Sequence, residues 1–229
     1  MIQKQQQGEI DKNKVKIVIV DDHPILRQGL TNLINQEKDL EVCAQTEDAH
    51  QAMQSIKSLK PVVAIVDISL KETSGIELIK DIKNHFPNLL VLVLSMHDEF
   101  LYAERALRAG AKGYIMKEAA TENVILAIRK ILDDQIYLSD AMTAQFLRRL
   151  ANGEPLIGSS SMERLSDREL EVFNLIGRGR GTRQIAEELH LSIKTIETYR
   201  ENIKKKLNLA DAPELLHYAF QWVKSQEGE

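Results

Sequence analysis

The sequence predicts two domains: an α/β domain with a doubly wound, five-stranded parallel sheet, followed by a smaller all-helical domain. Two observations predict this division. Up to about residue 134, short β-branched runs of strand length alternate with segments of helical periodicity. From Ser166 onward, every apolar pattern is helical. A chain of 229 residues is also long enough for two ordinary domains.

The five expected strands are continuous apolar runs, which is typical of parallel strands that are covered by helices on both faces. They are predicted at residues 16–20, 40–44, 62–66, 89–94 and 113–116. A helix with apolar residues three and four positions apart follows each strand. Pro24 begins the first helix, Asp48 caps the second, and Thr121 caps the fifth. The third and fourth helices are expected at residues 76–82 and 100–109.

The second half begins with one expected helix at residues 139–151, before a linker that contains two Gly, a Pro and three consecutive Ser. Ser166 and Glu169 form a predicted capping box, Thr182 caps a short helix, and Ser192 caps a longer one. A final helix begins near residue 211. The expected domain limits are a polar tail at 1–13, the α/β domain at 14–134, a linker with a helix at 135–162, and a four-helix domain at 163–229.

The composition is that of a globular protein without a membrane partner. No stretch reaches the roughly 18 consecutive apolar residues that a membrane helix needs. The polar N-terminus has no apolar signal-peptide core, and Cys43 is the single cysteine, which excludes an internal disulfide. We therefore expect a cytoplasmic protein. The net charge is −4, yet residues 178–206 contain eight basic and four acidic residues, a local charge of +4 that points to nucleic acid.

Polar residues follow four of the five strands. Asp21 and Asp22 come after the first strand, Asp67 after the third, Ser95 after the fourth and Lys117 after the fifth. In a parallel sheet, these positions meet at one edge, where ligands bind. Three carboxylates in one place favour a hard divalent cation such as Mg²⁺. A carboxylate beside Mg²⁺ is a plausible phosphoryl acceptor.

Two other interpretations compete with this one. Acidic residues are also favoured at strand ends because they face the N-termini of helices, although five polar residues at matching ends make this explanation weaker. An Mg²⁺-dependent phosphatase with an aspartate nucleophile would need a second acid two residues after Asp67, where the chain has Ser69. The sequence also has no phosphate-binding loop motif. We therefore expect that the protein is not an enzyme.

Four segments, IVIVDDHP, VVAIVDISLKETSG, VLVLSMHDE and AGAKGYIMKE, resemble the receiver domain of two-component response regulators in order and spacing. The resemblance covers about residues 15–134 and implies a flavodoxin-like fold. It implies that Asp67 is the phosphoacceptor and that Asp21, Asp22 and the Ser69 carbonyl join Asp67 in holding Mg²⁺.

The same resemblance assigns a switch to the other polar residues of the sheet edge. Ser95 would be the hydroxyl that turns toward the phosphoryl group, Lys117 would contact the phosphate, and Tyr114 would change rotamer on activation. The phosphoryl donor would be a sensor histidine kinase. An alternative is a receiver that serves only as a dimerisation scaffold, with constitutive DNA binding.

The expected helices at residues 184–189 and 193–207 have the lengths of a helix-turn-helix that inserts its second helix into the major groove. Ile196 and Ile203 would face the core of this domain. The opposite face is polar and would contact DNA; it carries Lys194, Thr195, Glu197, Thr198, Arg200 and Glu201. The competing interpretation is a plain helical hairpin with a solvated, charged face.

The segment LSDRELEVFNLIGRGRGTRQIAEELHLSIKTIETYRENIKKKLNL resembles the LuxR-type domain of NarL/FixJ response regulators, over about residues 163–225. By this resemblance, Thr182 and Lys194 contact phosphates and Lys205 lies near the DNA backbone. Thr195 also belongs to the expected contact set, and Glu197, Thr198 and Glu201 are placed to face the bases. Leu216 and Phe220 would form the surface through which two copies dimerise on double-stranded DNA. Together, the two resemblances imply a phosphorylation-controlled regulator of transcription.

Overall fold

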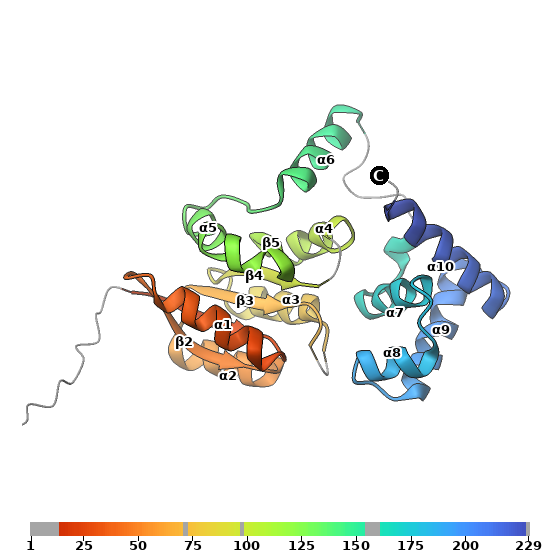
Figure 1. The fold of residues 1–229 in the computed structure, drawn as a ribbon, viewed down its shortest axis with the longest axis horizontal. Coiled ribbons are helices and arrows are strands. Elements are labelled where there is room, and N and C mark those ends of the chain that lie inside the picture. The colour runs from red at the N-terminus through yellow and green to blue at the C-terminus, as the bar shows by residue number, and fades with distance from the viewer. Residues whose placement is uncertain (1–13, 71–72, 97–98, 154–160, 228–229) are drawn as a thin grey trace, which may run out of the picture.

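The computed structural model describes residues 14–70, 73–96, 99–153 and 161–227 (Figure 1). The expected polar tail at residues 1–13 lies outside this part of the chain. Within it, no helix is both long enough and apolar enough to cross a bilayer.

The first domain is built on a five-stranded sheet with the strand order β2-β1-β3-β4-β5, and all four pairings are parallel. This arrangement confirms the predicted fold class. The strands are β1 (Val15–Val20), β2 (Leu40–Thr46), β3 (Val63–Asp67), β4 (Leu90–Ser95) and β5 (Gly113–Met116). β2 runs two residues further than expected because its end, Thr46, still pairs with Val20 of β1.

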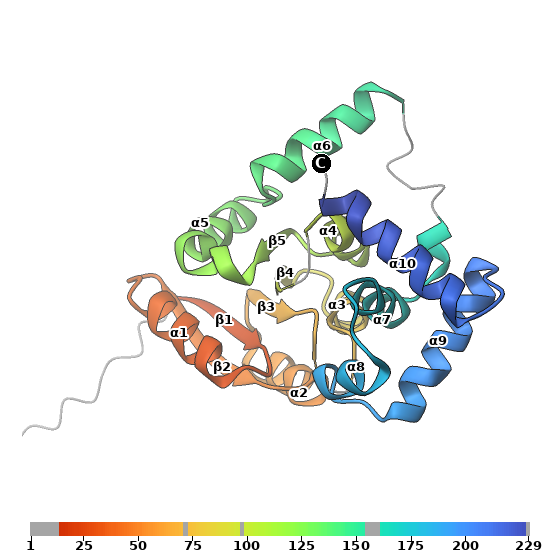
Figure 2. The same ribbon diagram turned by 45° about the vertical axis from the view of Figure 1, so that its right-hand side comes forward.

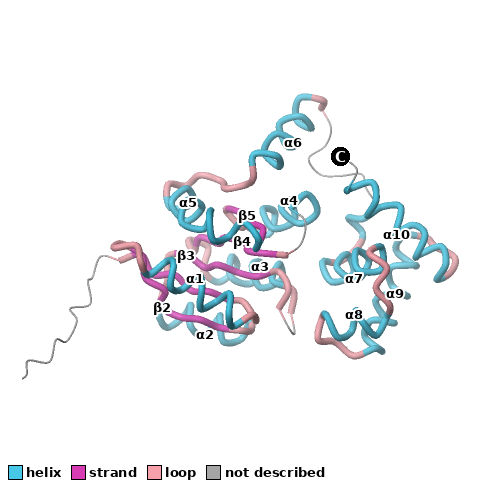
Figure 3. Tube along the Cα trace, in the orientation of Figure 1, coloured by secondary structure: helices cyan, strands magenta, loops and turns pink. Residues whose placement is uncertain are grey.

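Helices cover both faces of the sheet, as the continuous apolar strands predicted. Residues of α1 and α5 form one buried cluster with one face of the sheet, and residues of α2, α3 and α4 pack on the other face (Figure 3). The helices are α1 (Pro24–Asn35), α2 (Ala49–Leu59), α3 (Gly75–His85), α4 (Glu99–Ala109) and α5 (Ala120–Leu132).

The chain leaves the sheet along its open edge. Tyr137 lies beside β5, donates its backbone N–H to the Lys112 carbonyl (2.9 Å) and accepts one from Tyr114 (2.9 Å). Helix α6 (Asp140–Ala151) follows, capped by the Ser139 side chain. The unpaired edge of β5 is therefore covered by the start of the connecting segment, which protects it from pairing with other chains.

The second domain is helical, as predicted. After the short 3₁₀ helix η2 (Ser161–Arg164), it consists of α7 (Asp167–Gly177), α8 (Thr182–Glu188), α9 (Ile193–Leu207) and α10 (Ala212–Glu227). Its core includes Phe173, whose ring packs edge-on against the rings of Tyr218 and Trp222. Gly177 allows α7 and α10 to approach closely, because a Cβ at this position would lie 2.4 Å from the Ala219 carbonyl.

Helix starts were predicted with mixed success. The capping box of Ser166 and Glu169 and the Ser192 cap are both present. The predictions for Thr121 and Thr182 as caps were wrong by one or two positions. α5 continues directly from the 3₁₀ helix η1 (Lys117–Ala119), so it begins at Ala120, and Thr182 is the first residue of α8, which follows an extended Gly181.

Candidate phosphoacceptor site and DNA-reading face

The three aspartates meet at the C-terminal edge of the sheet, as the strand order requires. Asp67 ends β3 and pairs in register with Leu94 of β4, while Asp21 follows β1. Asp21 and Asp67 are each only 1% exposed. One ligand atom from each of Asp21, Asp22, His23 and Asp67 can be chosen so that all four lie within 4.8 Å of one another.

Lys117 balances part of this negative charge. Its Nζ lies 2.6 Å from Asp67 Oδ2 and 2.8 Å from Asp21 Oδ2. Burial raises the pKa of Asp67 to about 6; Lys117 opposes this shift and the neighbouring Asp21 adds to it. Burial lowers the pKa of the Lys117 ammonium, but the attraction of Asp67 and Asp21 outweighs this effect and holds that pKa above its usual value. The site therefore holds more negative charge than one lysine neutralises.

The donor set fits a divalent cation. Within the described part of the chain, no donor makes a hydrogen bond to Asp21 Oδ2 or Asp22 Oδ1, although both atoms are buried. Lys117 and the exposed His23 reach these two atoms only as ion-pair contacts, both at 2.8 Å. Buried carboxylate oxygens with spare lone pairs are the ligands that hard cations such as Mg²⁺ prefer. The acidic pocket is consistent with a metal site.

The loop after Asp67 is held tightly against it. The Ser69 backbone N–H donates to Asp67 Oδ1 (3.1 Å), and Ser69 also pairs with Ser74 in an isolated bridge. Gly75, the first residue of α3, touches the Asp67 backbone so closely that a Cβ there would lie 1.9 Å from the Asp67 carbonyl oxygen. Only glycine leaves room for this approach of helix to strand.

The two predicted switch residues are both buried in the receiver domain. Ser95 ends β4 and is fully buried, next in sequence to Leu94, the residue paired with Asp67. Tyr114 on β5 is 1% exposed and pairs with Val93. The structure therefore brings Asp21, Asp22, Asp67, Ser95 and Lys117 to one edge, and places Tyr114 two residues before the end of β5.

The polar side chains of α9 form one exposed face. Ile196 and Ile203 point into the domain and are fully buried, as predicted. Thr195 and Arg200 are half-buried, and the remaining predicted contact residues of the helix are exposed: Lys194, Glu197, Thr198, Glu201 and Lys205. Their spacing of three and four positions places them along one side of the helix. Thr182, at the start of α8, is half-buried.

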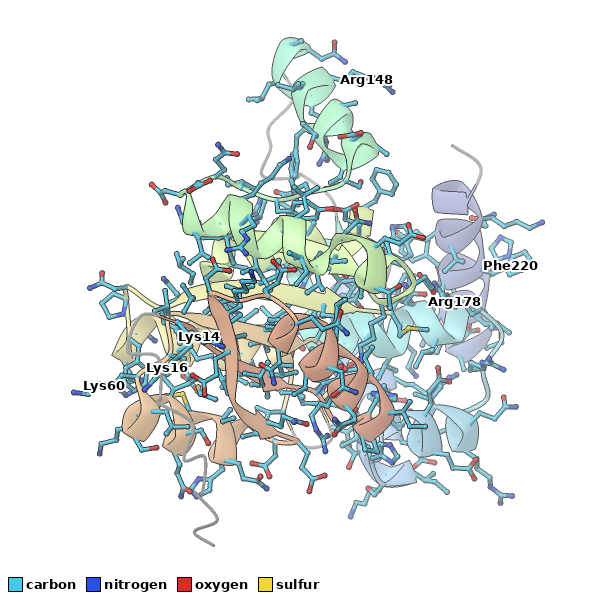
Figure 4. The ribbon with its side chains drawn as sticks, turned by 60° about the vertical axis from the view of Figure 1, so that its left-hand side comes forward. Lys14, Lys16, Lys60, Arg148, Arg178 and Phe220 are labelled. Carbon is cyan, nitrogen blue, oxygen red and sulfur yellow. The ribbon has the colours of Figure 1, made fainter. Side chains whose placement is uncertain are left out.

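Some of the side chains on this face of α9 are held by contacts within the helix. Lys204 pairs with Glu201 at 2.8 Å, and this hydrogen bond lowers the pKa of the Glu201 carboxyl. Thr198 donates its hydroxyl to the Lys194 carbonyl one turn earlier (2.9 Å). The two residues predicted for dimerisation, Leu216 and Phe220, lie on α10 and are 49% and 47% exposed. Figure 4 shows the Phe220 ring on the outer side of α10, away from the α/β domain.

Sequence reasoning missed a set of charged residues between the two domains. Arg168 and Glu171 of α7 are 7% and 2% exposed, although charged residues on a helix are usually solvated. Arg105 of α4 reaches across to Asp167 (2.9 Å). The only signal in the sequence was the i, i+3 spacing of Arg168 and Glu171, which fits an exposed pair equally well.

Comparisons with known proteins agree with this architecture. Residues 17–129 match the response regulator receiver domain family, and residues 163–219 match the luxR family of bacterial regulatory proteins. The oxygen regulatory protein NreC of Staphylococcus epidermidis is 37% identical over 212 residues, which cover 90% of this chain and 97% of that protein. NreC of Staphylococcus haemolyticus is 36% identical over 211 residues, with the same coverage of both chains.

Solved structures give the same result. The RcsB response regulator of Salmonella typhimurium is 28% identical, with a TM-score of 0.62 over 91% of this chain and 98% of that one. RcsB of Salmonella enterica bound to a promoter in the presence of a phosphomimetic is 29% identical, with a TM-score of 0.58 over 90% and 98%. By both matches and by its two domains, this chain belongs to the two-component response regulators that join a receiver domain to a LuxR-type DNA-binding domain.

Proposed function

We propose that this DNA-binding response regulator accepts one phosphoryl group on Asp67 from a sensor histidine kinase, and that the phosphorylated form pairs on DNA to control transcription in the cytoplasm. The observation that carries the proposal is the buried acidic pocket with Lys117 at 2.6 Å from Asp67. Lys117 bridges Asp67 and Asp21, and the second carboxylate oxygen of Asp67 accepts from the Ser69 N–H.

The step is a phosphoryl transfer from a histidine of the kinase to Asp67. A carboxylate oxygen of Asp67 attacks the phosphorus, the bond from phosphorus to the kinase imidazole nitrogen breaks, and the imidazole leaves. Lys117 is placed to neutralise charge on the transferring group, and the Ser95 hydroxyl is placed to bind one of its oxygens. Asp21, Asp22, Asp67 and the Ser69 carbonyl would hold Mg²⁺, which would offset the remaining negative charge.

The test of the acceptor is phosphorylation of the purified protein by acetyl phosphate, with and without Mg²⁺, followed by intact mass. One added phosphoryl group that requires Mg²⁺ and is lost in Asp67→Ala is the expected result. Asp133→Ala, which removes an exposed carboxylate, is the matched control and should be phosphorylated like the wild type. An adduct that persists in Asp67→Ala would refute Asp67 as the acceptor, and no adduct in any protein would favour the scaffold interpretation.

For DNA contact, we propose that Thr182, Lys194 and Lys205 meet phosphates and that the face of Thr195, Glu197, Thr198 and Glu201 meets bases. The exposure of Lys194, Glu197, Thr198, Glu201 and Lys205 on α9 supports this assignment. The first turns of the second helix of such a pair enter the major groove. The solved RcsB–DNA complex is 28% identical, with a TM-score of 0.54.

Two substitutions separate the two kinds of contact. Lys194→Ala should weaken binding to all sequences alike and reduce the slope of log affinity against log salt by about one. Thr198→Ala should change the preferred site while leaving that slope unchanged. An unchanged site preference in Thr198→Ala, measured by selection from a random DNA pool, would show that the base-reading face lies elsewhere.

We also propose that two copies pair through Leu216 and Phe220. Both side chains are large, apolar and about half exposed on the outer side of α10. RcsB forms dimers on DNA in a solved structure that is 29% identical, with a TM-score of 0.55. An apolar surface of this kind on a helix is typical of a contact between identical subunits.

A further inference from the structure

The DNA-binding domain reaches the loop that follows Asp67. Two side chains of α7 make these contacts. The Ser69 hydroxyl donates to Glu171 Oε1 at 3.0 Å, and Arg168 donates to the Leu70 carbonyl at 2.5 Å. Arg168 and Glu171 are also paired with each other at 2.7 Å. The second and third residues after Asp67 are therefore held by the other domain.

A second set of contacts anchors α7 at a distance from this loop. Arg105 of α4 donates to Asp167 Oδ1 (2.9 Å) and to the carbonyls of Leu165 (3.0 Å) and Met162 (2.8 Å). Lys80 of α3 also lies 3.4 Å from Asp167. Figures 1 and 2 both place α7 beside α3 and α4. Because these anchors are independent of Glu171, a change at Glu171 alters the hold on the loop without releasing the domain.

The docked state does not cover the DNA-reading face. Among the described residues, the hydrogen bonds and ion pairs between the domains are made by α7 and the residues just before it, while Lys194, Glu197, Thr198 and Glu201 of α9 remain exposed. The buried pair of Arg168 and Glu171 therefore acts on the receiver side of the interface, where its partners are the residues next to the phosphoacceptor.

We propose that Glu171 is a positioning residue for phosphoryl transfer: from the DNA-binding domain, it holds Ser69, and with it the loop after Asp67, in the resting geometry. The proposal rests on Asp67 being the phosphoacceptor. A phosphoryl group brings on the order of 1.5 to 2 negative charges close to the Glu171 carboxylate, which disfavours the contact. The Ser69 carbonyl must also be free to turn toward a cation. Phosphorylation and the Glu171–Ser69 contact therefore oppose each other, and each weakens the other equally.

The test is the rate at which acetyl phosphate and Mg²⁺ phosphorylate the full chain, followed by intact mass. The Asp67 carboxylate takes the phosphoryl group and acetate leaves. Glu171→Gln should be phosphorylated about three to ten times faster than the wild type, since the net contribution of an ordinary hydrogen bond corresponds to about this factor in an equilibrium constant. Glu187→Gln, which neutralises an exposed carboxylate of α8, should react at the wild-type rate.

Combining Glu171→Gln with Ser69→Ala distinguishes a positioning role of Glu171 from an effect of its negative charge alone. In Ser69→Ala, the carboxylate is kept but the hydroxyl that it holds is gone, so Glu171→Gln should add little further acceleration. If Glu171→Gln accelerates the reaction by the same factor in the wild type and in Ser69→Ala, the Glu171 carboxylate acts only through the electrostatic effect of its charge. The positioning role is then refuted.

A third variant keeps the test decisive if Glu171→Gln folds poorly. Arg105→Ala removes the distant anchor and should also accelerate phosphorylation, because the hold of α7 on the loop is then weaker. Wild-type rates in the variants that fold would overturn the proposal. No adduct in the wild type, or one that survives Asp67→Ala, would instead be a failure of the assigned acceptor.

Discussion

Replacing Asp67 by Asn should stabilise the folded protein when no divalent cation is present. Burial raises the pKa of Asp67 from 3.8 to about 6, so the folded state binds this proton more tightly than the unfolded state. Ionising the carboxyl therefore costs folding free energy as the pH rises from about 4 to about 6, and the full cost is present above pH 6. The size of the shift corresponds to about 3 kcal/mol. Asparagine keeps the shape and the acceptor oxygen but never ionises.

The measurement is urea denaturation of the full chain in EDTA, at pH 8 and at pH 4.5, followed by far-ultraviolet circular dichroism. At pH 8, the receiver transition of Asp67→Asn should move up by about 1 to 2 M urea relative to the wild type. Near pH 4.5, most of this difference should vanish because the wild-type carboxyl is then largely protonated in the folded state. Comparing two variants at each pH cancels the acid sensitivity of the other groups.

Two controls complete the experiment. Asp133→Asn, at an exposed position, should leave the transition where it is. Mg²⁺ should stabilise the wild type and have little effect on Asp67→Asn, because binding to the folded state alone raises its stability. An Asn variant that is no more stable than the wild type at pH 8 in EDTA would refute the reasoning, since it would mean that Lys117 already compensates fully for the buried charge.

Three further predictions follow from local geometry. Gly75→Ala should destabilise the receiver by about 3 kcal/mol or more and abolish phosphorylation, because its Cβ would lie 1.9 Å from the Asp67 carbonyl oxygen. A thermal scan measures the change in stability. Gly29→Ala, whose Cβ would meet nothing within 4 Å, is the control and should be neutral or stabilising in the same scan. Ser166→Ala should cost about 1 kcal/mol in the helical domain, since the cap of α7 is lost, and an unchanged melting temperature would contradict this. Phe220→Ala should weaken pairing on DNA without altering phosphorylation, which sedimentation with a two-half-site duplex would measure.

The sheet and the acidic pocket could be predicted because both depend on local patterns. Parallel strands are apolar throughout, so each strand is visible as a run, and the residue that follows the run is placed at the edge by topology alone. Asp21, Asp67 and Lys117 were found in this way. The pattern could not show that Lys117 is paired with both carboxylates, since this depends on side-chain geometry.

The contact between the domains could not be predicted for a physical reason. Arg168 and Glu171 are charged residues at helical spacing, and such residues are normally solvated. Only the folded chain brings them against Ser69 and Leu70, about one hundred residues earlier in the sequence. The starts of α5 and α8 were misplaced because threonine is a good cap wherever it occurs, and the structure uses Ala119 and Gly181 instead.

The anchoring of Tyr137 to β5 has a consequence for how strong the contact between the domains must be. Because the connecting segment is held to the sheet edge as far as Tyr137, and residues 140–151 fold into α6, which is about 18 Å long, much of the chain between the two domains is already ordered. A covalent tether of this kind turns docking into an intramolecular step, with an effective concentration on the order of millimolar. A handful of hydrogen bonds, too weak to join two separate proteins, is then enough to keep the domains together, and, on the mechanism proposed above, weak enough for a single phosphoryl group to separate them.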